Sequence, residues 1–392
     1  MLTTPLNVLF AGEEAKAKTP ENGNANHQHP TVSQLTRYKW WLQMAIFTVF
    51  VLAGQSVATL LGRLYFDKGG KGKWISTLVQ VAGFPVLLPL LLISPTKKNH
   101  PSETLITPYI KKQPSLLTLV TIYLLFGVFL GANCMLYTIG LLYLPVSTYS
   151  LICASQLGFN AFFSFFLNAQ KFTPLIINSL FLLTISSTLL VFNNDPSEST
   201  ASKSKYAIGF VCTVGASAGY GLLLAVTQFA FTRILKIETI RVVFEMIIYP
   251  SVVAACAILV GLFASGEWKT YKNEMEVFEL GKVSYVMTLV WIAIAWQVFS
   301  IGCVGLIFKV SSLFSNVIST LGLPIVPSLA VVFFHDKMDG VKVVSMLLGI
   351  WGFGSYIYQH YLDDLKLKAE GKKLGNKESP SEVSLVERGQ LV

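Results

Sequence analysis

Basic residues are missing from the interiors of the long apolar runs that fill most of this sequence. Between about Trp41 and Gln359 no such run carries an interior Lys or Arg, and Glu245 is the one acid expected at membrane depth. Charged residues make up 13% of the chain, whereas a soluble domain has about 25%. This lack of charge argues against a soluble domain. The net charge of +9 comes from tails and loops rather than from a basic stripe, so it does not indicate nucleic-acid binding.

Metal-ligand and disulfide patterns are also missing. The five cysteines all fall inside apolar runs without CxxC spacing: Cys134, Cys153, Cys212, Cys256 and Cys303. A buried free cysteine behaves as a small hydrophobic residue, so no redox site is indicated. The five histidines are scattered among tails and loop ends, which argues against zinc. No nucleophile with a neighbouring base, and no metal or cofactor site, is predicted. We therefore expect a protein that is not an enzyme.

The sequence does contain many apolar runs of membrane-spanning length. About 20 apolar residues cross a bilayer as a helix, and the mean hydropathy of the chain is +0.58. The pattern predicts an all-α polytopic membrane protein with ten transmembrane helices, at about 41–62, 74–94, 115–140, 144–168, 174–192, 206–231, 242–265, 284–307, 313–334 and 342–360.

Both ends of the chain are polar. We expect disordered tails at residues 1–36 and 365–392, and an even number of spans places both tails on one side of the membrane. Lys and Arg are moderately more frequent in the loops on the tail side, which favours cytoplasmic tails. The expected location is the plasma membrane, and an internal membrane stays an alternative.

Two stretches far apart in the chain match each other. Leu142, Val146, Ser147, Ser155, Leu157 and Gly158 align with Leu306, Val310, Ser311, Ser319, Leu321 and Gly322. The match predicts two five-helix halves, at 37–192 and 206–364, joined by a loop at 193–205. Because five spans is an odd number, the halves would lie in opposite orientations, as in the inverted repeats of secondary transporters. Chance similarity between two apolar helices is the alternative.

Uncharged polar side chains recur along the spans at helical spacing. Polar groups in hydrocarbon usually face a bundle interior or a cavity, and amides offer both donors and acceptors. We therefore predict a cavity for a small neutral or protonatable heterocycle, with Trp296, Tyr137 or Tyr149 stacking on its ring. The alternative is that each amide only bridges two helices, worth about 0.6 kcal/mol. The predicted binding residues are Gln55, Asn133, Tyr137, Gln156, Asn160, Trp296, Gln297 and Asn316.

Glu245 is the candidate proton carrier. A carboxylate within a membrane span is a functional candidate by default. The alternative is a salt bridge at the helix end with Arg241, one turn earlier.

Several long stretches of the chain carry a family resemblance. They include GQSVATLLGRLYFDKGG (Gly54 to Gly70), TLVQVAGFP (Thr77 to Pro85) and VSSLFSNVISTLGLPIVP (Val310 to Pro327). Others are Tyr38–Trp41, Tyr143–Asn168, Ala216–Gln228, Phe333–Met338 and Trp351–Asp364, so the resemblance runs from about residue 37 to 364. Together these stretches resemble the plant purine permease family, within the drug/metabolite transporter superfamily.

This resemblance implies a two-by-five inverted-repeat carrier with proton-coupled uptake of adenine, related bases or cytokinins. Alkaloids or vitamin B6-type rings are the alternative cargo. A nucleotide-sugar or phosphate-ester exchanger fits poorly, because it would need a buried Lys or Arg. A receptor that does not transport would not need two matching halves.

Overall fold

The computed structural model describes residues 29–93, 115–144, 149, 152–192, 203–236, 239–322 and 340–377. Their regular secondary structure is helical throughout, without a strand in these ranges. The predicted all-α class is therefore confirmed for this part of the chain. Residues 193–202 of the expected connecting loop and much of the predicted span 313–334 lie outside the described residues. The last part of that loop, 203–205, already belongs to a helix that begins at Lys203.

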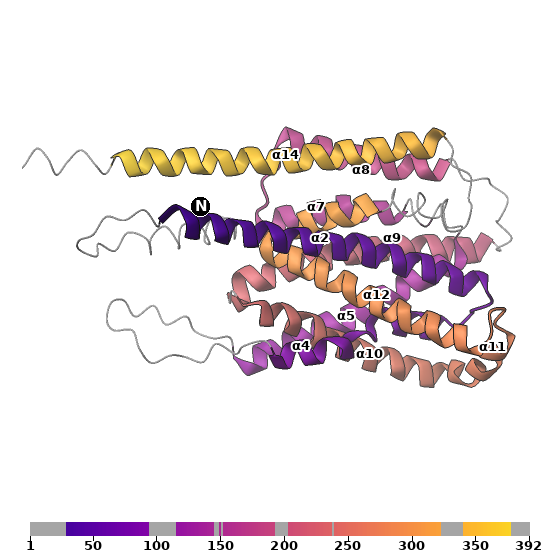
Figure 1. Cartoon of the computed structure of the whole chain (residues 1–392). Helices are drawn as coiled ribbons and strands as arrows, with labels where there is room; N and C mark the ends of the chain where they lie inside the picture. The colour runs from indigo at the N-terminus through magenta and orange to yellow at the C-terminus, as the bar shows by residue number, and fades with distance from the viewer. Residues whose placement is uncertain are drawn as a thin grey trace, which may run out of the picture.

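The first part of the chain forms helices that run back and forth along one direction (Figure 1). They are α2 (His29–Asp67), α3 (Lys73–Val81), the short 3-10 helix η1 (Phe84–Leu87), α4 (Leu88–Ile93), α5 (Leu116–Tyr143), α7 (Gln156–Asn168) and α8 (Pro174–Phe192).

The second part contributes a similar set of helices. They are α9 (Lys203–Phe229), the π-helical turn η2 (Ala230–Leu235), α10 (Ile240–Ser265), the 3-10 helix η3 (Glu267–Thr270), α11 (Tyr271–Val277), α12 (Lys282–Lys309), a helix over residues 312–322, and α14 (Gly340–Lys377).

Six of the described segments are long and apolar enough to cross a membrane. They are Tyr38–Asp67, Lys73–Leu92, Leu116–Tyr143, Ser204–Leu235, Ile240–Ser265 and Lys282–Lys309. A shorter apolar helix runs over Pro174–Ser186. Large apolar side chains lie exposed along these segments, as expected for surfaces in contact with lipid rather than water. By length and composition, these segments are candidate membrane spans of a polytopic protein.

Two predicted spans are interrupted rather than continuous. The span at 74–94 breaks after Val81 and continues through a 3-10 turn, because Pro85 has no backbone N–H to donate to a helix. In the span at 144–168, Ser155 forms a turn before α7 begins. The Ser155 hydroxyl donates to the carbonyl of Ile152 at 2.5 Å, so a side chain competes there with helical backbone bonding.

Helices extend past both predicted tail boundaries. The α2 helix begins at His29, inside the expected tail 1–36, with Pro30 in its first turn, where the missing N–H of proline has no cost. The α14 helix continues to Lys377, past the boundary at 364. Leu and Lys make up eight of the residues 365–377, and both are strong helix formers.

Helices from the two parts of the chain pack against one another. The α2 helix packs along α12, α5 packs against both α9 and α10, and α8 packs against α14 at one edge of the bundle (Figure 1). Glycine permits the closest of these approaches. A Cβ atom on Gly54 of α2 would lie 2.6 Å from the backbone nitrogen of Phe299 and 2.8 Å from the carbonyl oxygen of Ala295, both on α12.

The α2–α12 contact generates a stability prediction. We expect Gly54→Ala to destabilise the protein by about 1–3 kcal/mol, because the added methyl meets backbone atoms that cannot rotate away. The measurement is the apparent melting temperature in detergent. Gly62→Ala on the same helix is the control, since a Cβ there meets nothing within 4 Å. Equal melting temperatures of the two variants would contradict the close packing.

Candidate functional site

A cavity of about 570 Å³ lies where α2, α3, α5, α7, α9, α10 and α12 meet. Small-molecule sites commonly have about 300–1,000 Å³. Its lining extends from Arg63 and Asp67, near the end of α2, to Thr227 on α9 and Ile307 on α12. The side chains of Arg63 and Asp67 are exposed and form an ion pair at 3.4 Å, so the cavity has its mouth at this end.

A polar cluster at the mouth joins α2 to α11, the short helix before α12. The carboxylate of Glu274 on α11 accepts hydrogen bonds from the hydroxyls of Tyr65 on α2 and Tyr285 on α12. The Tyr285 bond measures 3.3 Å. Tyr65 also lines the cavity, and its ring packs 5.9 Å from the ring of Tyr285. The cluster therefore connects the wall of the cavity to the α11 segment.

Two titratable groups near this mouth have altered proton affinity. Burial raises the pKa of the Glu267 carboxyl, and this outweighs the hydrogen bond that it accepts from the backbone N–H of Trp74 at 3.2 Å. Burial also raises the pKa of Tyr271 to about 12, with further contributions from the charges of Glu267 and Glu274. The mouth thus holds carboxylates and phenols in a partly desolvated environment.

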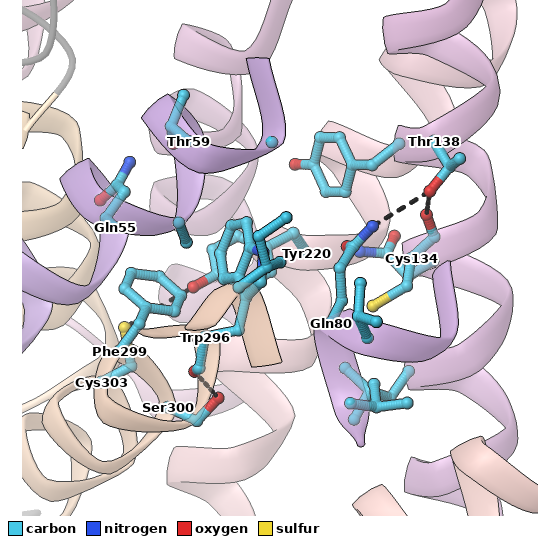
Figure 2. Close-up of a pocket in the computed structure, with 18 of the residues that line it drawn as sticks. Gln55, Thr59, Gln80, Cys134, Thr138, Tyr220, Trp296, Phe299, Ser300 and Cys303 are labelled. Carbon is cyan, nitrogen blue, oxygen red and sulfur yellow. Dashed lines mark hydrogen bonds between the residues drawn. The ribbon is translucent and has the colours of Figure 1, made fainter. Parts of the chain in front are cut away.

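One wall of the cavity combines an amide with aromatic rings. Figure 2 shows Gln55 of α2 together with Trp296 and Phe299 of α12. The Gln55 side-chain oxygen accepts a hydrogen bond from the Ser319 hydroxyl at 3.0 Å. The indole of Trp296 lies 5.3 Å from the ring of Phe299 in an edge-to-face arrangement. This wall offers an amide nitrogen and flat apolar faces to a bound ring.

Tyrosines surround the middle of the cavity. Tyr137 of α5 lies 6.2 Å from the ring of Tyr149 and 6.5 Å from that of Tyr220 on α9, both nearly perpendicular to it. Its hydroxyl donates to the side-chain oxygen of Gln156 at 3.2 Å. Gln156 is the first residue of α7, so the turn at Ser155 sets its position in the wall. The predicted residues Tyr137 and Gln156 therefore come together.

Asn133 also lines the cavity, from the middle of α5. It packs closely on α9, because a Cβ on Gly219 would lie 2.4 Å from the Asn133 side-chain oxygen. Five of the eight predicted binding residues thus line one cavity, namely Gln55, Asn133, Tyr137, Gln156 and Trp296.

Asn160 lies outside the cavity lining and bridges helices instead. It is fully buried, its side-chain nitrogen donates to the carbonyl of Ser312 at 3.1 Å, and its oxygen accepts from Ser164 at 3.2 Å. Gln228 of α9 completes the network by accepting from the backbone N–H and the hydroxyl of Ser312, each at 2.8 Å. These bonds tie α7 and α9 to the helix over residues 312–322.

Gln297 and Asn316 are likewise buried and absent from the cavity lining. The Asn316 side-chain nitrogen donates to the carbonyl of Gln156 at 3.2 Å, behind the wall. Gln297 packs beside the turn after α3, where a Cβ on Gly83 would lie 2.8 Å from the Gln297 Cβ. Among the described residues, its side-chain nitrogen and the Asn316 side-chain oxygen are buried without a hydrogen-bond partner. Helix bridging, the alternative interpretation of the amides, therefore fits the Asn316 nitrogen, whereas Gln297 is a packed amide without a bridging bond.

Gln80 and Thr138 form a polar wall that the sequence analysis did not select (Figure 2). The Gln80 side-chain nitrogen donates to the Thr138 hydroxyl at 3.0 Å and to the carbonyl of Ser76 at 3.2 Å. The rule that selects Gln55, an amide within an apolar run, applies equally to Gln80. The signal was therefore present in the sequence.

Glu245 lies on α10 outside the cavity lining. Its carboxylate pairs with the guanidinium of Arg241 at 2.9 Å, and both side chains are partly exposed. This is the salt bridge that the alternative interpretation expects. Among the described residues, no group of three His, Cys, Asp or Glu side chains is placed to hold a metal ion.

Comparisons with known proteins give a consistent result. A family model described as purine nucleobase transmembrane transport matches residues 42–366. Purine permease 21 of Arabidopsis thaliana is 58% identical over 361 residues, which cover 92% of this chain and 91% of that protein. Probable purine permease 10 of the same plant is 57% identical with the same coverage. Probable purine permease 13 is 47% identical and covers 90% of this chain and 95% of its own length.

The chain belongs to the purine permease family. This confirms the resemblance found in the sequence, and it identifies a membrane transporter rather than an enzyme. A solved structure titled only as the crystal structure of a protein superposes with a TM-score of 0.52 at 15% identity. It covers 80% of this chain and 97% of the other. That likeness concerns the fold alone.

The different positions of Gln156 and Asn160 in this permease generate a paired prediction. We expect Gln156→Leu to weaken substrate binding by about tenfold, since one hydrogen bond contributes about 1 kcal/mol or more when its partner is desolvated. Asn160→Leu is expected to lower stability by about 1–3 kcal/mol, because the Ser312 carbonyl loses a buried donor. Binding of radiolabelled substrate and melting temperature in detergent separate the two effects. Reversed effects, with Asn160 controlling affinity, would contradict this assignment.

Proposed function

We propose that this permease is a secondary active, proton-coupled importer of purine bases such as adenine, of cytokinins, or of both. The observation that carries the proposal is the cavity within the membrane bundle, lined by amides and aromatic rings and with a mouth at one end. Relatives named as purine permeases support the purine part of the proposal.

The chemistry of the lining supports an uncharged heterocycle as cargo. Gln55, Gln156 and Asn133 provide hydrogen-bonding amides, and Trp296 provides a face for stacking. Arg63 is the cationic side chain in the described lining, and it is paired with Asp67 at the mouth. A phosphorylated substrate would need a desolvated cation deeper in the cavity, so this lining argues against a nucleotide-sugar exchanger.

Closure of the opposite end supports alternating access. Beyond Ile307 and Thr227, where the lining ends, the Gln228–Ser312–Asn160 network joins α9, α7 and residues 312–322. An apolar cluster extends on the same side from Ile307 in the lining to Phe231 and Leu235 outside it. We propose that transport breaks these contacts while the Tyr65–Glu274 cluster changes at the mouth. With cytoplasmic tails, the described state would be open to the outside.

The packing of helices supports ten spans in two inverted halves. The first helix of each proposed half packs on the third helix of the other half, since α2 packs along α12 and α9 along α5. The second helix of each proposed half also contacts the third helix of the other half, since α3 contacts α12 and α10 contacts α5. Such pairing is what a two-fold axis in the membrane plane generates.

The ends of the described chain support tails on one side. The start of α2 and the end of α14 lie at the same end of the bundle, opposite α11 (Figure 1). Together with the distribution of Lys and Arg, this supports the proposal of cytoplasmic termini. The plasma membrane is the proposed location.

Uptake measurements test the transport proposal. We expect cells expressing the protein to accumulate radiolabelled adenine more strongly at acidic than at neutral pH, and a protonophore to abolish the difference, because the proton gradient drives uptake. Cells expressing Gly54→Ala at matched surface level serve as a control for folding.

Other outcomes of this assay favour other candidates. Uptake of cytokinins, alkaloids or vitamin B6-type rings without adenine would assign the cargo within the same fold. Binding without accumulation would point to a receptor. Accumulation that ignores pH and the protonophore would overturn proton coupling.

For the proton itself we propose Glu245 as carrier, a carboxylate within the α10 span whose charge is balanced by Arg241. Glu245→Gln is expected to remove the pH dependence of uptake while substrate binding persists, because the cavity does not contain this residue. The paired change Arg241→Gln tests whether the salt bridge alone matters. Unchanged pH dependence in Glu245→Gln would reduce Glu245 to a structural ion pair.

A further inference from the structure

We propose that Gln80 determines substrate selectivity: its side-chain oxygen is a fixed acceptor that favours bases with an amino group at that position over bases with a carbonyl there. This inference rests on the proposed purine cargo and assigns a role to a residue outside the set selected from the sequence. It follows from how the two ends of the Gln80 amide are used.

The nitrogen of the Gln80 amide is fully occupied by the protein. It donates to the Thr138 hydroxyl oxygen at 3.0 Å and to the Ser76 carbonyl at 3.2 Å. An amide nitrogen carries two hydrogens, and these two acceptors use both. No donor capacity is left for a ligand.

Thr138 fixes the direction of this amide. The Thr138 hydroxyl lies 3.0 Å from the carbonyl of Cys134, to which it donates its single hydrogen. Its oxygen can then only accept from Gln80. The Thr77 hydroxyl oxygen lies 2.9 Å from the Thr138 hydroxyl oxygen and 2.8 Å from the Lys73 carbonyl oxygen. The Thr138 hydroxyl is therefore itself held in place by α3.

A reversed Gln80 amide would lose the bond to Ser76, because its oxygen would then face a carbonyl oxygen, acceptor against acceptor. It could bond Thr138 only by drawing the hydroxyl hydrogen away from the Cys134 carbonyl. Leaving such groups unpaired in a desolvated site is unfavourable. The observed direction therefore follows from the chemistry of the partners and not from the assignment of the amide atoms alone.

The Gln80 oxygen remains for the ligand. Gln80 is half-buried and lines the cavity, and among the described residues its oxygen accepts no hydrogen bond. A partly desolvated acceptor in a binding cavity favours a ligand N–H over a ligand carbonyl, which would place two acceptors together.

Other walls present the opposite polarity. The Gln55 oxygen accepts from Ser319 and the Gln156 oxygen accepts from Tyr137, which leaves the nitrogens of both amides as donors. Figure 2 shows Gln55 and Gln80 on different walls, with Tyr220 between them in this view. A base with ring-nitrogen acceptors along one edge and an amino group on another fits this arrangement.

The test compares adenine with hypoxanthine, which carries a carbonyl in place of the amino group. Purified full-length protein is assayed for displacement of radiolabelled adenine by each unlabelled base. We expect the wild type to prefer adenine by about tenfold or more, since sites built on hydrogen bonds discriminate strongly against a ligand that leaves them unpaired. Gln80→Leu is expected to reduce this preference to less than about threefold, because the acceptor is gone.

Thr138→Val provides a second variant with an intact Gln80. Loss of the hydroxyl removes one of the two acceptors that hold the Gln80 nitrogen and leaves only the Ser76 carbonyl. The amide is then less strongly oriented, so the adenine-to-hypoxanthine ratio should fall although Gln80 itself is unchanged. Thr121→Val is the matched control on the same helix, because the exposed Thr121 hydroxyl also donates to the carbonyl four residues earlier, at 2.8 Å. Gln359→Leu on α14 controls for loss of an amide elsewhere.

The outcomes separate this inference from the proposed function. Adenine binding with an unchanged ratio in Gln80→Leu and Thr138→Val would overturn the inference and leave the purine cargo intact. Equal loss of affinity for both bases would overturn it as well, because Gln80 would then only support the wall. Failure of the wild type to bind adenine would remove adenine from the proposed cargo and overturn this inference. If Gln80→Leu does not fold, the ratio in Thr138→Val decides.

Discussion

The cavity depends on the constraint that a polar group in a membrane interior must find a partner within the protein. Gln55, Gln80 and Gln156 each use one end of the amide for a bond to a neighbouring helix, through Ser319, Thr138 and Tyr137 respectively. The other end is left to the cavity. Each amide therefore serves twice: it fixes the packing of the helices that form the wall, and it presents a donor or an acceptor of defined direction to the ligand. Under the proposed function, the side chains that hold the bundle together also contact the substrate.

The same constraint separates the two ends of the bundle. At the end beyond the cavity, Asn160, Ser164, Gln228 and Ser312 satisfy one another in a dry network, which resists opening because breaking it exposes several groups at once. At the mouth, the ion pair of Arg63 and Asp67 is exposed, and water can replace such a bond at low cost. The difference in solvation fits a state that opens at the α11 end.

Much of this molecule could be predicted from the sequence, because hydrocarbon imposes simple rules. Apolar length located the six described membrane helices, and amides inside apolar runs led to Gln55, Asn133 and Gln156. The same rule also selected Asn160, Gln297 and Asn316, which lie behind the wall, because an amide that faces a cavity and one that bridges helices occupy equally apolar runs. The direction in which such an amide side chain points depends on its neighbours in the tertiary structure, such as Ser312 for Asn160. The breaks at Ser155 and Pro85 depend on local hydrogen bonding. They change where the helices begin, whereas hydrophobic periodicity alone predicts one continuous helix in each span.

A cavity lined mainly by uncharged side chains has a consequence for the transport cycle. A lining built on charged side chains would have to desolvate them each time the cavity closes, which is expensive in a membrane. Amides and hydroxyls already bonded to neighbouring helices need little reorganisation when water leaves, so an empty cavity and a loaded cavity differ modestly in free energy. Arg63 and Asp67, the charged pair in the described lining, lie at the mouth where both stay exposed. A carrier must return empty as readily as it crosses loaded, and a neutral interior with its charges at the rim satisfies that requirement.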